Sequence, residues 1–185
     1  MSFPVLTVCL GNVCRSPQAE LLLAARLRER GVEPEVSSAG ARALVGRSVD
    51  PSSAAELDAR GVAHDTFAAR QLTPALVQPA ALVLTATRDL RSRVLEEVPG
   101  ALRRTFTLRE FAAHCERLVA AEGSPYADPR ELVAQAAAQR GSVVLEDPDI
   151  PDPIGRSEQT HALVATLIDD AVTTIASALV RAGLR

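Results

Sequence analysis

The sequence contains no lysine and no tryptophan, and its aromatic residues are one tyrosine and four phenylalanines. All 20 basic residues are therefore arginines, and the net charge of −3 gives no global reason to expect a nucleic acid or an anionic membrane as partner. No apolar run approaches the roughly 20 residues that span a bilayer. The N-terminus also lacks a basic segment leading into a signal-like apolar stretch, so we expect neither membrane insertion nor export.

Cysteine is scarce as well, and the three present, Cys9, Cys14 and Cys115, do not have the spacing of zinc ligands. The three histidines are scattered along the chain and show no metal-ligand spacing either. An odd number of cysteines does not suit a disulfide framework, whereas it suits a reducing compartment. We therefore expect a cytoplasmic protein without a metal site.

What the sequence does contain suits a compact core, because 47% of its 185 residues are hydrophobic and 23% are charged. Short apolar runs predict strands at residues 3–8, 33–40, 80–85 and 104–108. Helical periodicity and capping residues predict helices at residues 18–27, 52–60, 87–97 and 158–181, with a short one from residue 74. This alternation of strand and helix indicates a parallel sheet covered on both faces.

The Ala-rich segment 111–141 departs from that alternation. Its pattern is helical and is interrupted by Gly123, Ser124 and Pro125, so we expect two additional helices there. The last predicted helix carries an apolar stripe that we expect to face the core. Its members are Leu163, Leu167, Ala171, Ile175, Ala178 and Leu179.

The most informative stretch follows the first predicted strand and reads Cys9-Leu10-Gly11-Asn12-Val13-Cys14-Arg15-Ser16-Pro17. Gly11 and Asn12 tolerate positive φ, so successive backbone amides can turn inward and form a cradle for an anion. The start of the next helix adds unpaired amides and the positive end of its dipole. These groups and the guanidinium of Arg15 favour the nucleophilic thiolate form of Cys9. Arg15 also presents a planar fork of donors to two oxygens of a phosphate-like group.

This stretch resembles the signature loop of the low-molecular-weight protein tyrosine phosphatases, in which a cysteine, five residues and Arg-Ser stand between a strand and a helix. The resemblance implies a metal-free, cofactor-free hydrolase of phosphotyrosine in protein or of a small phosphomonoester, with inorganic phosphate as product. Cys9 would attack phosphorus and form a thiophosphate intermediate, while the amides of Leu10 to Arg15 and the Arg15 side chain stabilise the equatorial oxygens. We predict a single α/β domain over residues 1–185, with a four-stranded parallel sheet in the order 2-1-3-4, helices on both faces and an extra helical insertion near residues 111–141.

The resemblance also implies supporting roles. Ser16 matches a hydroxyl that hydrogen-bonds the thiolate, Asn12 matches the residue that holds the loop in its strained shape, and Ser38 matches the usual partner of that residue. Cys14 matches a second cysteine that many members use as a reversible redox guard, through a disulfide with Cys9. A small residue that fills space under the loop is an equally good interpretation of Cys14.

A leaving alkoxide or phenoxide needs a proton, which a carboxylic acid held above the cradle can supply. The proline-stiffened segment 146–155 contains three aspartates. In the family the acid belongs to an Asp-Pro pair just before the C-terminal helix, and Asp152-Pro153 matches that position. Asp149 and Asp147 remain alternatives. In the second step the same carboxylate would deprotonate the water that hydrolyses the thiophosphate.

The chain departs from the family pattern in the pocket walls, where aromatic side chains are usual. Segment 41–46 contains none, and Ile154 follows the Asp-Pro pair. Val13 stands where tyrosine-directed members have an aliphatic residue and arginine-phosphate-directed members a threonine, which favours an aryl or tyrosyl phosphate. Two other functions stay open: arsenate reduction with a low-molecular-weight thiol, and non-catalytic binding of phosphoproteins.

Overall fold

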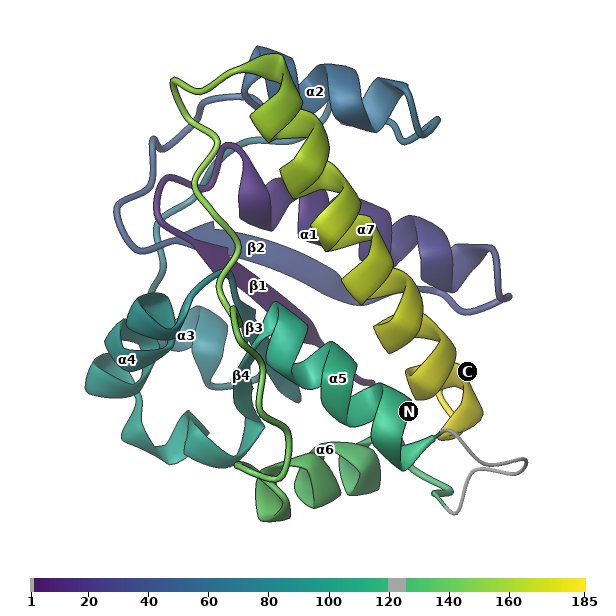
Figure 1. The fold of residues 1–185 in the computed structure, drawn as a ribbon. Helices are drawn as coiled ribbons and strands as arrows, with labels where there is room; N and C mark the ends of the chain where they lie inside the picture. The colour runs from purple at the N-terminus through teal and green to yellow at the C-terminus, as the bar shows by residue number, and fades with distance from the viewer. Residues whose placement is uncertain (1, 120–125) are drawn as a thin grey trace.

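The computed structural model describes residues 2–119 and 126–185, so the predicted helix break at residues 123–125 lies outside the described residues. A four-stranded sheet runs through the middle of the molecule with helices packed around it (Figure 1). Its strands are β1 (Val5–Cys9), β2 (Val36–Gly40), β3 (Leu82–Thr85) and β4 (Thr105–Thr107). They are all parallel and lie in the order β2-β1-β3-β4, which confirms the predicted fold class.

Several helices begin directly after a residue whose side chain caps their N-terminus. Asp50 accepts hydrogen bonds from the amides of Ser52 and Ser53, and Thr107 forms a capping box with Glu110. That box explains why one helix begins before residue 111, where the extra helical segment was predicted to start. The helices are α1 (Arg15–Arg28), α2 (Pro51–Asp58), α3 (Pro74–Val77), α4 (Arg88–Glu97), α5 (Leu108–Leu118), α6 (Pro129–Ala138) and α7 (Glu158–Arg181), and a 3₁₀ helix over Pro99–Arg104 was not predicted.

Alternating residues of the central strands face two separate hydrophobic cores. Val5 of β1 contributes to the larger core, together with side chains of α1, α5 and α7, whereas Leu6 and Val8 contribute to a smaller core beneath α3 and α4. In the same way Leu82 faces the larger core and Val83 the smaller one. Both faces of the sheet are therefore covered by helices, as parallel sheets require.

The stripe predicted on the last helix is wrong at its N-terminal half. Leu163 is 54% exposed and Leu167 is partly exposed, whereas Val164 and Ile168 are fully buried. Adjacent helical residues point about 100° apart, so Val164 and Ile168, one position later, face the core instead. The rest of the stripe, from Ala171 to Leu179, is buried as predicted.

The same helix corrects the expectation about apolar runs. Among the described residues α7 alone has the length and composition of a membrane-crossing helix, and half of its most apolar window is buried within the molecule. It packs on α1, α2 and α5 (Figure 1). A core helix of a folded domain meets the same criterion, and these contacts account for its apolar face.

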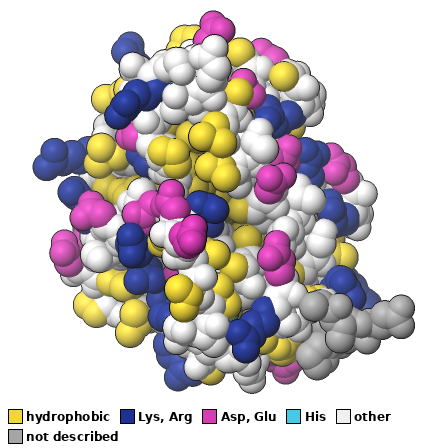
Figure 2. All heavy atoms as spheres, in the orientation of Figure 1, with side chains coloured by type: hydrophobic (Ala, Val, Ile, Leu, Met, Phe, Trp, Pro, Cys, Tyr) yellow, Lys and Arg dark blue, Asp and Glu magenta, His cyan; other side chains and the backbone are white. Residues whose placement is uncertain are grey.

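The carboxyl ends of the strands lie at one edge of the sheet, where ligands of such folds bind. The segment between α6 and α7 runs past this edge to reach the start of α7 (Figure 1). It is fastened to the sheet at Ile150, whose side chain is buried and whose amide donates to the carbonyl of Ala86 at 2.8 Å. In the space-filling view of this face, hydrophobic side chains gather among acidic and basic ones (Figure 2).

Candidate active site

Residues 10–14 connect Cys9, the last residue of β1, to Arg15, the first residue of α1. Segment 41–50 lies around this loop and binds its carbonyl groups from outside. Because the carbonyls face that segment, the amide face of the loop is turned toward the pocket, as an anion-binding site requires. Three N–H···O bonds fix this orientation: Arg42 to Leu10 at 2.8 Å, Leu44 to Gly11 at 2.9 Å and Asp50 to Val13 at 2.8 Å.

Asn12 holds the loop in shape. Its φ of 55° is the one positive value at a non-glycine residue in the described part of the chain, and its side chain is completely buried. Its Nδ2 donates to Ser16 Oγ at 2.9 Å and to Ser38 Oγ at 2.8 Å, and its Oδ1 accepts from the amide of Arg70 at 2.8 Å. A left-handed conformation is costly for a side-chain-bearing residue, and these three bonds offset that cost.

Two residues that support this network were not predicted from the sequence. Ser38 Oγ donates to Glu20 Oε2 at 2.5 Å, and Arg70 Nε donates to the carbonyl of Ser38 at 2.6 Å. Burial raises the pKa of Glu20, and the Ser38 hydroxyl and the Arg70 charge partly oppose that shift. No spacing in the sequence links Arg70 to the loop, because the contact depends on how segment 41–72 folds back.

Gly40 makes the close packing of β2 against the loop possible. A Cβ atom at this position would lie 2.7 Å from the carbonyl oxygen of Leu10 and 2.9 Å from the amide nitrogen of Asn12. Such distances are shorter than van der Waals contact, so the glycine is required by the backbone of the loop itself.

The sulfur of Cys9 lies at the base of the loop and accepts two hydrogen bonds. Ser16 Oγ donates to it at 2.9 Å, and the amide of Asn12 donates at 3.2 Å. Donors directed at sulfur stabilise a thiolate relative to a thiol. The predicted pairing of Ser16 with Cys9 is therefore present in the structure.

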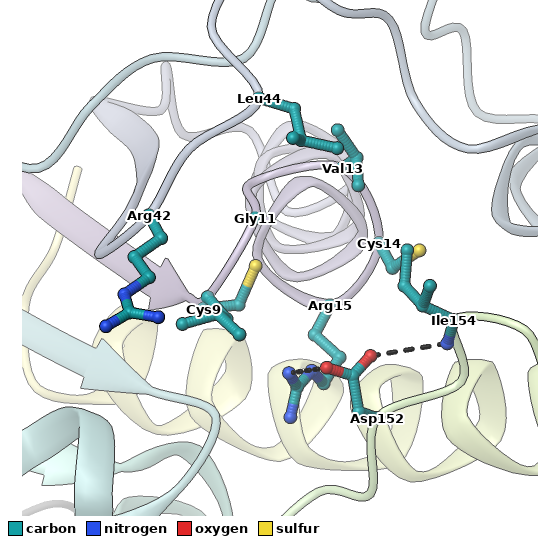
Figure 3. Close-up of a pocket in the computed structure, with 10 residues that line it drawn as sticks. Cys9, Gly11, Val13, Cys14, Arg15, Arg42, Leu44, Asp152 and Ile154 are labelled. Atoms are coloured by element: carbon teal, nitrogen blue, oxygen red, sulfur yellow. Dashed lines mark hydrogen bonds and ion pairs between the residues drawn. The ribbon is translucent and has the colours of Figure 1, made fainter.

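Arg15 joins the loop to the segment before α7. Its buried side chain donates from Nη2 to Asp152 Oδ2 at 2.6 Å (Figure 3). Its Nη1 donates to the carbonyl of Ile150 at 3.0 Å. The other oxygen of Asp152 accepts from the amide of Ile154 at 3.3 Å, and buried Pro153 lies between them in the chain. These contacts bring Asp152 to the pocket although it follows Arg15 by more than a hundred residues.

The two alternative aspartates lie elsewhere. Asp149 Oδ1 accepts from the amide of Arg88 at 2.9 Å, so it holds the N-terminus of α4. The backbone carbonyl of Asp147 accepts a hydrogen bond from Arg109. Neither side chain lines the cavity above Cys9.

That cavity has a volume of about 220 Å³. Leu44 and Ile154 form walls on the segments where the resemblance places aromatic residues, and both are about half exposed. Arg42, which the sequence analysis did not single out, stands at the mouth on the Cys9 side (Figure 3). The other lining residues are Cys9, Leu10, Gly11, Val13, Cys14, Arg15 and Asp152.

All three cysteines are buried and form no disulfide. Burial raises the pKa of Cys14 to about 12, against a smaller opposing effect of a hydrogen bond with Ser53. Cys115 is buried in α5, and burial raises its pKa further still. Cys9, whose sulfur accepts two hydrogen bonds in the pocket, therefore differs from Cys14 and Cys115, whose pKa values are raised by burial.

Each of the three histidines contacts another side chain of the fold. His64 pairs with Asp58, His161 contacts Ser53, and His114 is buried against the ring of Phe106. Within residues 2–119 and 126–185, no group of three or more His, Cys, Asp or Glu side chains is placed to hold a metal ion.

Comparison with known proteins relates both the sequence and the fold to one family. A family model described as low molecular weight phosphotyrosine protein phosphatase matches residues 4–139. The low molecular weight protein-tyrosine-phosphatase Wzb of Salmonella typhimurium is 30% identical over 182 residues, which cover 95% of this chain and 93% of the relative.

Solved structures of phosphatases have a similar fold. The tyrosine phosphatase AmsI of Erwinia amylovora superposes with a TM-score of 0.73 at 24% identity, over 97% of this chain and 94% of the other. The arginine phosphatase YwlE of Geobacillus stearothermophilus superposes with a TM-score of 0.68 at 23% identity, over 95% of this chain and 92% of the other. At this identity the likeness shows the fold alone. Together with the matching family model and the Wzb relative, it leads to one conclusion: this chain belongs to the low molecular weight phosphotyrosine protein phosphatase family.

Proposed function

We propose that residues 1–185 form a single phosphatase domain that hydrolyses phosphotyrosine in proteins through a phosphocysteine intermediate on Cys9. One observation carries the proposal: a sulfur that accepts hydrogen bonds from Ser16 and Asn12 lies within an amide-lined loop, next to an Arg15–Asp152 pair. The retained thiols suit a reducing compartment, and we place the protein in the cytoplasm.

In the first step the thiolate of Cys9 attacks phosphorus in line with the ester oxygen. The sulfur–phosphorus bond forms as the phosphorus–oxygen bond breaks, and Asp152 transfers its carboxyl proton to the departing oxygen. The loop amides and the guanidinium of Arg15 stabilise the equatorial oxygens, where negative charge is concentrated in the transition state. Arg15 is already held rigidly by Ile150 and Asp152, so little reorganisation is required.

In the second step Asp152, now ionised, removes a proton from water. The resulting oxygen nucleophile attacks phosphorus, the sulfur–phosphorus bond breaks, and inorganic phosphate leaves the regenerated thiolate. Ser16 stabilises that leaving thiolate through its 2.9 Å hydrogen bond. The cycle uses only side chains and backbone amides of this chain.

The pocket walls support an aryl ester as substrate. Val13, Leu44 and Ile154 surround the cavity with aliphatic surface, which can pack against a phenyl ring without aromatic stacking. Relatives with this fold are named tyrosine or arginine phosphatases. We propose that this chain prefers phosphotyrosine.

The decisive variants are Cys9→Ser and Asp152→Ala, assayed with p-nitrophenyl phosphate and with alkyl phosphates. Cys9→Ser should lose turnover while it still binds phosphate, because the amides and Arg15 remain. Asp152→Ala should lose most activity on substrates with poor leaving groups, by about 10²–10⁴-fold. Asp149→Ala is the matched control, and its effect should not depend on the leaving group.

The same assays decide between the alternatives. Wild-type rates in Cys9→Ser would contradict the mechanism, and a leaving-group effect confined to Asp149→Ala would move the acid to that residue. Arsenate reductase activity would require an external thiol, because Cys115 is buried in α5 away from the pocket. Thiol-dependent arsenite formation with negligible aryl phosphate hydrolysis would establish that function instead. Turnover itself would exclude a purely phosphoprotein-binding role.

A further inference from the structure

Arg42 is an unusual member of the pocket lining. Its backbone is fixed to the loop, since its amide donates to the carbonyl of Leu10 at 2.8 Å. Its side chain is exposed and borders the same cavity as Cys9. In the close-up it stands on one side of the mouth, while Ile154 and Asp152 stand on the other (Figure 3).

The charge of Arg42 is not neutralised. Arg15, the other cation of the pocket, forms an ion pair with Asp152 at 2.6 Å. The Arg42 guanidinium has no hydrogen bond or ion pair with any residue that the structure describes, and Asp152 is the one carboxylate in the lining. A fixed backbone with an unpaired, exposed guanidinium at the mouth offers a docking point for an anionic group outside the phosphate cradle.

We propose that Arg42 determines substrate specificity by binding a carboxylate next to the phosphorylated residue, so that the preferred substrates are phosphotyrosine segments with a flanking Asp or Glu. This rests on the proposed phosphatase function. With the phosphate on the loop amides and the ring between Leu44 and Ile154, the flanking peptide residues lie at the mouth of the cavity, where Arg42 stands. A bidentate guanidinium–carboxylate pair there adds binding without contact to the reacting atoms.

The test compares two phosphotyrosine peptides that differ only in whether the flanking residues are Glu or Gln. We expect wild-type kcat/KM to be several-fold higher for the Glu peptide, mainly through a lower KM. Arg42→Glu should reverse this preference. Arg47→Glu is the matched control, because Arg47 is an exposed arginine of the same segment that does not line the cavity. It makes the same charge change and should keep the wild-type ratio. Arg47→Glu should also hydrolyse p-nitrophenyl phosphate at the wild-type rate.

Three outcomes would overturn the inference. Equal rates for the two peptides in the wild type would remove the selectivity. If Arg47→Glu changed the ratio of kcat/KM between the Glu and Gln peptides as much as Arg42→Glu does, the selectivity would be a long-range charge effect. Added salt would screen such an effect. An equal loss on all substrates of Arg42→Glu, p-nitrophenyl phosphate included, would show that Arg42 attracts the phosphate itself. Absence of aryl phosphate hydrolysis in the wild type would instead contradict the proposed function, so the two failures are distinguishable.

Discussion

Among single residues, Asn12 has the most demanding position, because it combines a positive φ with three buried side-chain hydrogen bonds. Asn12→Ala should lose those bonds and keep the strain, which lowers the free energy of unfolding by about 2–4 kcal/mol. Asn12→Gly also loses the three hydrogen bonds, but glycine adopts a positive φ without strain. This variant should therefore be about 1 kcal/mol more stable than the alanine variant. Urea unfolding measures both. Equal stability of the two variants would show that φ at this position is not costly.

The second prediction for single residues concerns which of the three cysteines reacts with an alkylating reagent. The pKa of Cys14 is raised to about 12, so its reactive thiolate is scarce at pH 8 and increases only as the pH approaches that value. Cys115 is buried more deeply. Iodoacetamide at pH 8 should therefore add one label to the native protein, on Cys9, and none to Cys9→Ser. Mass spectrometry of digested protein checks this, and labelling of Cys14 at a similar rate would contradict it.

At the scale of elements, the end of β2 lies directly against the loop at Gly40. Gly40→Ala should destabilise the protein by about 1–3 kcal/mol and reduce turnover, because the added methyl group displaces the backbone of Leu10 and Asn12. Gly100 in the 3₁₀ helix has open space around its Cα and no positive φ, so Gly100→Ala should be neutral or slightly stabilising. Thermal unfolding of Gly40→Ala and Gly100→Ala, with kcat measured in parallel, tests whether the two substitutions change stability in opposite directions.

The segment before α7 makes the other prediction about elements. Ile150 is 1% exposed and its amide binds the carbonyl of Ala86, the residue that follows β3, whereas Ile154 is 49% exposed. Ile150→Ala should lower the free energy of unfolding by about 2–5 kcal/mol. It should also lower kcat, since Asp152 and the Ile150 carbonyl, which both bind Arg15, would shift with the segment. Ile154→Ala should change stability by less than about 0.5 kcal/mol and mainly raise KM. Equal unfolding free energies for the two variants would contradict this account.

For the whole molecule, the site connects parts of the chain that are far apart, from β1 and α1 to the segment before α7. A phosphate ion bound to the loop and Arg15 should therefore stabilise the entire fold. At a phosphate concentration 100 times Kd the gain is about 2.7 kcal/mol, which raises Tm by roughly 5–10 °C in a protein of this size. Differential scanning calorimetry measures the shift, with chloride at equal ionic strength as control. The same shift in chloride would mean that phosphate does not bind specifically.

At every scale, the elements defined by local chemistry could be predicted from the sequence. The order of strands and helices, the start of α2 after Asp50 and the end of α1 near Gly31 follow from caps and turn residues. The 3₁₀ helix at Pro99–Arg104 was missed, because a Pro-Gly pair is typical of the end of a helix and does not by itself predict a new one. The stripe on α7 was misplaced, since an Ala-rich helix offers several apolar faces and only its neighbours select one.

By itself the sequence determined the fold class, through the alternation of strands and helices. It also determined the strand–loop–helix unit that brings Cys9, Asn12 and Arg15 together, because these residues lie close together in the chain and short-range backbone geometry controls their positions. Only the tertiary structure decided which aspartate faces Arg15 and that Glu20 and Arg70 support Ser38. It also decided that Arg42 stands unpaired at the pocket mouth. Those contacts join segments separated by tens of residues, and packing of the two cores on the sheet, rather than any local preference, sets their distances.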